Sequence, residues 1–369
     1  MKQTKKQLVC ENGARFVGQG FGADVERTAE LVFSTAMVGY QEILSDPSCC
    51  GQMVCMTYPI IGSYGLTDED FETKTPNIGG FIVREYNDNP SNYRYTQTLS
   101  DQMEESGIPG IQGVDTRMIT RMIRDQGSMR AIITDADLPV EQALERLRAE
   151  APMRDHVRRV SCKKTWYSRT SNPRYNVVAV DCGIKHSIIR SLNNCKCNVT
   201  IVPYDTPAET ILALRPDGLF LSNGPGNPED IPQVIKLVRQ LQGRLPIFGI
   251  CLGYQAVCLA NGARAFKMKF GHRGGNHPVR NLLSGKVEIT AQNHSYAIDA
   301  GSLESTPLEL THINLLDGTA EGVRCERERI FAVQYHPESC PGPQDSGYLF
   351  GWFIRNMEES KAQGGAYHA

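Results

Sequence analysis

A cysteine between two glycines, directly after an apolar run, is the feature that most restricts how this chain can fold. Residues 246–250 are short, apolar and rich in β-forming side chains, which predicts a buried strand. Residues 254–260 predict a helix that ends at an Asn-Gly cap. Cys251 lies between them, and a glycine two residues to either side permits a turn that bulkier residues would strain. We therefore expect Cys251 on a sharp strand-to-helix elbow.

Such an elbow would suit a nucleophilic thiol. The partial positive charge at a helix N-terminus favours the ionised thiolate. The amide of Leu252 is free at the helix start and could stabilise a developing oxyanion. The same pentapeptide also fits an ordinary core cysteine, because the chain has twelve cysteines and most cysteines are buried. The pentapeptide alone leaves both interpretations open.

A histidine and a glutamate follow a second predicted strand, at residues 330–335. His336 lies at the end of this strand, and Pro337 forces the chain to turn. Glu338 is close enough to orient the imidazole if the turn folds back. A nucleophile needs a base and the base needs an orienting group, and Cys251, His336 and Glu338 supply all three. The alternative for His336 is a capped strand end that faces solvent.

Two further features adjoin this set. A predicted strand at 218–222 runs into Gly224-Pro225-Gly226, a loop whose backbone N–H groups suit an oxyanion or a carboxylate. Glycine and proline also form ordinary turns, so this signal is weak alone. Gln255 lies four residues after Cys251, which places it on the helix face beside the thiol. An ordinary surface glutamine is the alternative.

Strands and helices alternate with short connections from residue 177 to residue 262. This pattern predicts an α/β fold with a doubly wound, mostly parallel sheet, preceded by a separate mixed α/β N-terminal domain. Ligands bind such sheets at the carboxyl ends of the strands, where Gly224 and Cys251 fall. Short strands and a final helix at 348–360 should follow. The expected divisions are an N-terminal domain at 1–150, a linker at 151–175, a C-terminal domain at 176–360 and a tail at 361–369.

Composition excludes several functional classes. The net charge is −2 and no stretch is strongly basic, so we expect no nucleic-acid partner. No run approaches the roughly 20 apolar residues of a membrane span, and the N-terminus does not resemble a signal peptide. Twelve cysteines without a secretion signal indicate a reducing cytosol. No C-x-x-C pair occurs, and His272, His277 and His294 are expected to form loop hydrogen bonds, so no metal is expected.

Taken together, the motifs at 224–226, 249–255 and 336–338 resemble those of the class I (triad) glutamine amidotransferases, which have a flavodoxin-like fold. In that family the cysteine attacks the side-chain amide of L-glutamine. A γ-glutamyl thioester forms, ammonia leaves, and water releases glutamate. The resemblance implies that Cys251 is the nucleophile, His336 the acid/base and Glu338 the orienting carboxylate.

Nearly the whole chain resembles the small subunit of carbamoyl-phosphate synthetase. The similarity includes the segments 39–48, 57–59, 114–117, 267–278 and 290–294, and an N-terminal domain that other class I amidotransferases lack. It implies a cytoplasmic glutaminase subunit in a heterodimer. The large subunit would hold ATP and Mg²⁺ and make carbamoyl phosphate from bicarbonate for arginine and pyrimidine synthesis. No cofactor is expected on this chain, which also lacks a phosphate-loop motif.

The family's glutamine site can be carried over position by position. It implies that L-glutamine is bound by Ser48, Gly224, Gly226, Leu252, Gln255, Asn293, Ser295 and Tyr296. Two positions depart from the family pattern: Tyr254 replaces a usual histidine, and Ser295 a frequent glycine. Backbone amides would make the contacts at 295, so a serine can serve there if its φ is negative. For Ser48 the alternative is a simple turn serine.

Two rival functions remain open at this stage. The chain could serve another class I amidotransferase, of the anthranilate or GMP synthesis type, although the N-terminal domain argues against this. It could also be a non-catalytic regulatory subunit, although the intact Cys251, His336 and Glu338 argue against that. Identifying the synthetase that co-purifies would test the first rival, and a glutaminase assay would test the second.

Overall fold

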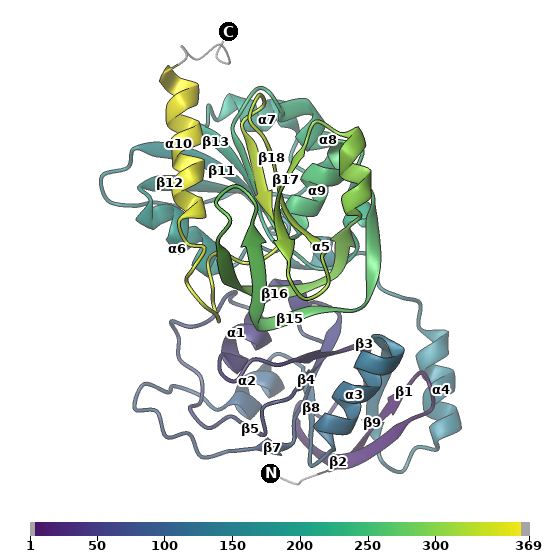
Figure 1. Cartoon of the computed structure of the whole chain (residues 1–369). Coiled ribbons are helices and arrows are strands. Elements are labelled where there is room, and N and C mark those ends of the chain that lie inside the picture. The colour runs from purple at the N-terminus through teal and green to yellow at the C-terminus, as the bar shows by residue number, and fades with distance from the viewer. Residues whose placement is uncertain (1–3, 363–369) are drawn as a thin grey trace. The chain divides into compact units, whose positions relative to one another are not determined.

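The computed structural model describes residues 4–362, which divide into two compact units (Figure 1). The first unit contains the described residues up to Met153 together with Lys269–Arg273. The second contains Arg154–Met268 and the described residues from Gly274 onward. The two units differ in architecture. The sequence likewise predicted a mixed α/β domain followed by a domain with a mostly parallel sheet.

A closed barrel of seven strands forms the centre of the first unit, in the order β1-β2-β8-β6-β4-β3-β9. Its strands are β1 (Lys5–Cys10), β2 (Arg15–Gly22), β3 (Arg27–Ser34), β4 (Gln52–Met56), β6 (Gly80–Ile82), β8 (Pro109–Gln112) and β9 (Met129–Asp135). A small pair joins β5 (Ile60–Ile61) to β7 (Glu85–Tyr86). The helices are α1 (Tyr40–Ser45), α2 (Leu99–Glu105), α3 (Thr116–Gln126) and α4 (Val140–Ala149), with a 3-10 turn at Pro47–Cys49.

Helix α3 has a capping residue at its start and buries part of its surface against the barrel. Asp115 caps it, because its side chain accepts a hydrogen bond of 2.9 Å from the backbone N–H of Met118. Ile119 and Ile123 are fully buried in the barrel core. Met118, on the same helix, is 59% exposed.

The second unit is built on a sheet of ten strands, in the order β10-β12-β11-β13-β14-β19-β18-β16-β15-β17. The strands are β10 (Trp166–Ser168), β11 (Tyr175–Asp181), β12 (Cys197–Pro203), β13 (Gly218–Leu221), β14 (Ile247–Ile250), β15 (Ala265–Asn281), β16 (Val287–Ile298), β17 (Glu309–Asn314), β18 (Ala320–Cys325) and β19 (Ile330–Val333). The helices are α5 (His156–Val160), α6 (His186–Asn194), α7 (Ala208–Ala213), α8 (Pro232–Leu241), α9 (Leu252–Ala260) and α10 (Leu349–Ala362), with 3-10 turns at Pro228–Asp230 and Ala300–Ser305.

Five neighbouring strands of this sheet, β12-β11-β13-β14-β19, are parallel. In chain order they follow the 2-1-3-4-5 arrangement of flavodoxin-like folds. Alternate residues of β11 enter opposite cores: Val178 and Val180 pack with α7, α8 and α9, while Val177 and Ala179 pack with α6 and α10. Helices therefore cover both faces of the sheet (Figure 1), which confirms the expected doubly wound fold.

Three segments differ from the sequence-based expectations. The strands after Gly262 are long, because β15 has 17 residues and β16 has 12, and glycines such as Gly271 and Gly274 let β15 bend at positive φ without ending. Residues 151–175, expected to be a linker, contain α5 and β10; β10 pairs with β12 at the sheet edge, where Trp166 packs on the core. Helix α10 continues to Ala362, and the rest of the expected tail, 363–369, lies outside the described residues.

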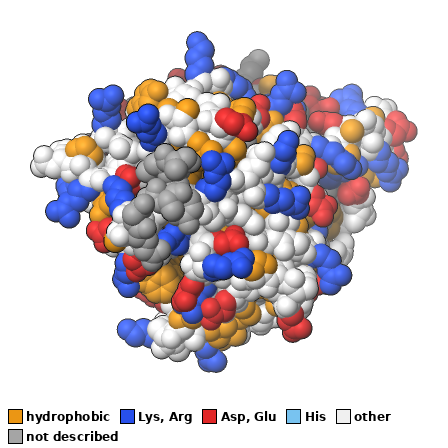
Figure 2. Space-filling view, turned by 90° about the horizontal axis from the view of Figure 1, so that it is seen from above, with side chains coloured by type: hydrophobic (Ala, Val, Ile, Leu, Met, Phe, Trp, Pro, Cys, Tyr) orange, Lys and Arg blue, Asp and Glu red, His pale blue; other side chains and the backbone are white. Residues whose placement is uncertain are grey.

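The surface agrees with the near-neutral composition. On the face seen in Figure 2, lysine and arginine side chains are interspersed with aspartate and glutamate. Within residues 4–362, no helix has both the length and the apolar character needed to span a membrane. The twelve cysteines all lie within the described residues, and none is assigned to a disulfide bond.

Candidate active site

Cys251 occupies the elbow between β14 and α9 with φ 54° and ψ −104°. A positive φ is costly for a residue with a side chain and persists only where the surroundings hold it. Here the Cys251 N–H donates to the carbonyl of Val333 at 2.8 Å, and the Cys251 carbonyl accepts from the N–H of Gln255 at 3.1 Å. The elbow predicted from the sequence is present, and its cysteine is held in a fixed orientation.

The two flanking glycines allow close approach of the backbone. A Cβ atom at Gly249 would lie 2.8 Å from the backbone of Gly253. A Cβ atom at Gly253 would lie 2.3 Å from the carbonyl oxygen of Leu221 on β13. Cys251 itself takes the unusual φ, while the glycines let β14, β13 and the start of α9 meet without a clash.

The turn after His336 folds back as the sequence predicts. His336 Nδ1 and Glu338 Oε1 are 2.7 Å apart, and both side chains are buried. The strand β19 ends two residues earlier than expected, at Val333, but the His336 N–H still donates to the carbonyl of Ala291 at 2.9 Å. The imidazole is therefore fixed by its backbone and by the carboxylate, and it is not the solvent-facing strand end considered as the alternative.

Lys185, which no sequence motif singled out, completes a buried chain of charges. Its Nζ lies 3.0 Å from Glu338 Oε1 and 2.7 Å from the carbonyl oxygen of Cys340. Burial alone would raise the pKa of Glu338, but the positive charges of Lys185 and His336 lower that pKa well below its usual range. Glu338 is thus an ionised acceptor for the His336 ring N–H at neutral pH.

The same contacts act on His336 in the opposite direction. Burial lowers the pKa of His336, but the charge and hydrogen bond of Glu338 raise it further than burial lowers it, and nearby Cys251 contributes to the rise. The other ring nitrogen, Nε2, is buried and accepts or donates no hydrogen bond of normal geometry within the described residues. A raised pKa favours the imidazolium, the partner that a thiolate nucleophile requires.

Two polar groups contact the thiol of Cys251. The sulfur lies 3.8 Å from the carbonyl oxygen of Asn293 and 3.6 Å from the side-chain nitrogen of Gln334. Gln255 is also buried, so the surface alternative is wrong; its amide nitrogen contacts both the Tyr296 carbonyl and the Gln334 side-chain oxygen. Gln334 was missed from sequence, although it alternates along the chain with His336 and Glu338 directly after β19.

Leu252, Gln255 and Asn293, three of the expected glutamine-binding positions, adjoin Cys251. Leu252 begins α9, where a backbone N–H has no acceptor within its own helix. Gly224 lies against it, since a Cβ there would be 2.8 Å from the Leu252 side chain. Gly226 has φ 91°, as its loop requires. Asn293, Ser295 and Tyr296 all lie in β16. The substrate contacts themselves stay a prediction for each of these residues.

Ser48 belongs to the first unit. It lies in the 3-10 turn at Pro47–Cys49, and its backbone N–H donates to Asp46 Oδ1 at 2.8 Å. The turn geometry fits the simple structural role that was the alternative for this serine. Its expected contact with glutamine stays a prediction.

The two departures from the family pattern have structural explanations. Tyr254 lies in α9, points into the core and donates from its hydroxyl to the Ala320 carbonyl at 3.1 Å. Ser295 lies within β16 and is not among the residues of positive φ, which meets the condition for a serine at that position.

The histidines at 272, 277 and 294 lie in strands instead of the expected loops. His294 binds the Tyr296 carbonyl and the Gln292 side chain, each at 2.8 Å.

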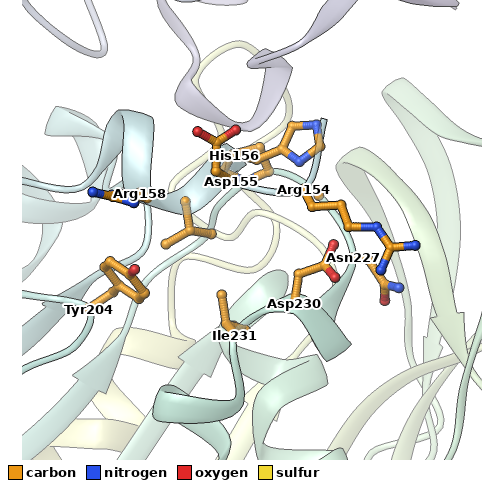
Figure 3. Close-up of a pocket in the computed structure, with 11 residues that line it drawn as sticks. Arg154, Asp155, His156, Arg158, Tyr204, Asn227, Asp230 and Ile231 are labelled. Atoms are coloured by element: carbon orange, nitrogen blue, oxygen red, sulfur yellow. The ribbon is translucent and has the colours of Figure 1, made fainter. Parts of the chain in front are cut away.

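A hollow adjoins the loop at Gly224–Gly226. It has a volume of about 180 Å³, and charged side chains of Arg154, Asp155, Arg158 and Asp230 line it (Figure 3). A Cβ at Gly226 would lie 2.9 Å from the His156 ring, so this loop also packs on α5. The hollow contains none of the three expected catalytic side chains.

Two family models match this chain, and each match falls mainly in one of the two units. Residues 178–356 match the family described as Glutamine amidotransferase class-I, and residues 8–133 match Carbamoyl-phosphate synthase small chain, CPSase domain. The first match begins within β11, ends within α10 and includes the elbow and the His336 turn.

Full-length relatives carry the same description. The carbamoyl phosphate synthase small chain of Bacillus cereus is 50% identical over 360 residues, which cover 98% of this chain and 98% of that protein. Those of Bacillus caldolyticus and Staphylococcus epidermidis are each 50% identical, over 365 and 357 residues. They cover 99% and 97% of this chain, and 100% and 97% of the respective relatives. This chain therefore belongs to the family of carbamoyl phosphate synthase small chains.

Proposed function

We propose that this chain is the glutaminase subunit of a carbamoyl-phosphate synthetase and that it hydrolyses L-glutamine at Cys251. The observation that carries the proposal is the buried series Cys251, His336, Glu338, placed at the carboxyl ends of β14 and β19. Its geometry matches the order of nucleophile, base and orienting carboxylate. The family matches supply the substrate class, which the geometry alone does not specify.

In the proposed reaction the Cys251 thiolate attacks the carboxamide carbon of glutamine. The Leu252 N–H, together with the loop at Gly224, stabilises the negative oxygen of the tetrahedral intermediate. His336 gives its proton to the departing nitrogen, so ammonia leaves and a γ-glutamyl thioester remains. His336 then takes a proton from water, which attacks the thioester carbon. Collapse of the second intermediate releases glutamate and restores the thiolate.

The ammonia has to be used by a second protein. We infer a large synthetase subunit as partner, in a heterodimer, which binds ATP and Mg²⁺ and consumes bicarbonate. This inference rests on the small-chain description of the relatives. The cytoplasm is the expected compartment, and arginine and pyrimidine synthesis are the expected uses of the product. The N-terminal match at 8–133 disfavours an anthranilate or GMP synthesis partner.

Reconstitution tests the proposal directly. The chain is mixed with the large subunit, bicarbonate and Mg-ATP, and carbamoyl phosphate is measured with glutamine or with ammonium as the nitrogen source. We expect product from both sources in the complex, and from ammonium alone when this chain is left out. Equal use of glutamine with and without this chain would contradict the proposed function.

A further inference from the structure

Gln334 is a fully buried polar residue to which the mechanism above gives no task. It follows β19 directly, and its backbone N–H donates to the Glu321 carbonyl at 2.9 Å. The side-chain Nε2 lies 3.6 Å from the sulfur of Cys251, within the range of an N–H···S hydrogen bond. A thiolate accepts such a bond more strongly than a thiol does, so a donor fixed in this place favours the ionised form.

The direction of this contact can be decided from the neighbouring groups. A glutamine amide can be placed with its oxygen and nitrogen exchanged, and the hydrogen-bond network has to determine which is correct. The carbonyl oxygen of Tyr296 is only an acceptor, and it lies 2.8 Å from the Gln255 amide. Gln255 must therefore turn its nitrogen toward Tyr296.

The second amide follows from the first. The same Gln255 nitrogen lies 2.9 Å from the side chain of Gln334, so Gln334 must present its oxygen there. The nitrogen of Gln334 is then left facing the sulfur of Cys251. A backbone carbonyl on β16 thus sets, through two glutamines, a donor that points at the sulfur.

We propose that Gln334 is a further catalytic residue, whose side-chain N–H holds the Cys251 sulfur as a thiolate, with Tyr296 and Gln255 fixing the direction of donation. The proposal rests on the proposed function only in taking Cys251 as the nucleophile. Gln334 lies two residues before His336, whose backbone pairs with Ala291 of β16, the strand whose Asn293 carbonyl also contacts the sulfur. An amide does not titrate, and its support is constant while His336 gains and loses a proton.

The test uses alkylation of Cys251 by iodoacetamide without glutamine, followed by mass spectrometry of the peptide that carries Cys251. Gln334→Met keeps the length of the side chain but removes the donor. Gln334→Glu keeps the shape and replaces the donor with a carboxylate oxygen. At pH 7 we expect alkylation about tenfold slower in Gln334→Met and slower still in Gln334→Glu. Both deficits should shrink as the pH rises, because base then ionises the thiol without a donor.

A matched control comes from the first unit. Gln7 is also fully buried, and its amide nitrogen donates to the carbonyls of Asp135 and Leu138 at 2.9 and 2.7 Å. Gln7→Met therefore loses buried hydrogen bonds of the same kind far along the chain from Cys251. We expect its alkylation rate to equal that of the wild type at every pH.

A double-mutant cycle tests the role of Gln255. As a single change, Gln255→Met should slow alkylation of Cys251, because the Gln334 amide can then turn its oxygen toward the sulfur. In the Gln334→Met background the same change should have no further effect on alkylation. Independent, multiplying effects of the two changes would show that Gln255 does not act through Gln334.

Three results would overturn the proposal for Gln334. One is wild-type alkylation at pH 7 in folded Gln334→Met. Another is a deficit that is equal at all pH values, which indicates lost access instead of lost ionisation. If Gln334→Met does not fold by circular dichroism, the isosteric Gln334→Glu decides, and wild-type alkylation of that variant would also overturn it. Because no glutamine is present, each result is independent of whether the chain is a glutaminase.

Discussion

Among residues 4–362, each unit buries one lysine beside acidic side chains, and the two lysines have different surroundings. On β1, Lys6 has a side chain only 6% exposed, but its partners Asp24 and Asp135 are 66% and 74% exposed. At the end of the parallel sheet, the side chain of Lys185 is 4% exposed and that of its partner Glu338 is completely buried. One lysine reaches out to hydrated carboxylates, while the other is enclosed with its carboxylate.

The difference in burial of the acidic partners distinguishes an ion pair with a structural role from an ion pair beside the proposed catalytic residues. Burial lowers the pKa of Lys6, but its two aspartates raise it above the usual range, and those aspartates keep most of their hydration. The Lys185–Glu338 pair loses the hydration of both charges, which usually costs more than their attraction returns. Such a pair is retained where its charge has a use, and here Glu338 holds the ring of His336. The enclosed Lys185–Glu338 pair thus contacts His336, a residue of the proposed chemistry.

The largest effect is expected from the nucleophile. Cys251→Ser should abolish glutamine hydrolysis, because a serine hydroxyl on this elbow stays protonated where the thiol would ionise. The complex with the large subunit should still make carbamoyl phosphate from ammonium. Glutamate release and carbamoyl phosphate are measured on the same preparation. Near-normal glutaminase activity in the variant would remove Cys251 from the proposed mechanism.

The next effect belongs to the proton carrier. His336→Asn keeps a polar side chain but cannot give and take the proton, so glutaminase activity should fall about 10³-fold or more. Steady-state glutamate release at saturating glutamine measures the loss. A variant within tenfold of the wild type would show that another group moves the proton.

Glu338→Gln should cost less, on the order of tenfold to a hundredfold, because the imidazole remains and only its orientation and charge support are lost. The pKa of His336 should fall in this variant, since the charge of Glu338 and its hydrogen bond raise it in the wild type. NMR titration of ring-labelled histidine follows this change, and the His336→Asn spectrum identifies the signal. An unchanged His336 titration, or a loss larger than that of His336→Asn, would contradict these roles.

The smallest effects compare the lysines directly. Lys185→Met should destabilise the protein by roughly 3–5 kcal/mol at pH 7, because it removes one of the two cations that offset the buried charge of Glu338. Lys6→Met leaves only hydrated aspartates and should cost no more than about 1 kcal/mol. Denaturant unfolding of both variants measures the difference, and glutaminase activity should fall only for Lys185→Met. Equal stabilities of the two variants would remove the distinction.

Acid should narrow the gap between the wild type and Lys185→Met. The folded-state pKa of Glu338 is depressed, so its ionisation stabilises the fold above the unfolded-state pKa of about 4.3. That contribution is lost as the pH falls through the folded-state pKa. The difference in unfolding free energy should therefore be full near neutral pH and shrink steadily below about pH 4.

Local patterns were sufficient for the framework of the second unit. The continuous apolar run in β11 and the apolar run before Cys251 predicted strands, because a strand covered on both faces is apolar at successive positions. The residues Cys251, His336 and Glu338 could be found because two short motifs hold them. The lengths of β15 and β16 could not, since glycines that usually end strands lie inside β15.

The missed residues depend on contacts between distant segments. Lys185 precedes α6 and meets Glu338 across 153 positions of sequence, and no spacing rule connects them. Gln334 had a usable signal, because it shares the alternation of His336 and Glu338. Its role depends on Gln255 and Tyr296, which reach it only after α9 and β16 have packed.

The covalent intermediate tests the central claim most directly. Enzyme turning over glutamine, with the large subunit, bicarbonate and ATP present, is quenched in acid, and its peptides are examined by mass spectrometry. We expect the peptide with Cys251 to carry the added mass of one γ-glutamyl group, removable by mild base or hydroxylamine as a thioester is. The Glu338→Gln variant should show the same adduct and the Cys251→Ser variant none. Sustained glutamine hydrolysis with an unmodified Cys251, or with the adduct on another residue, would contradict the account.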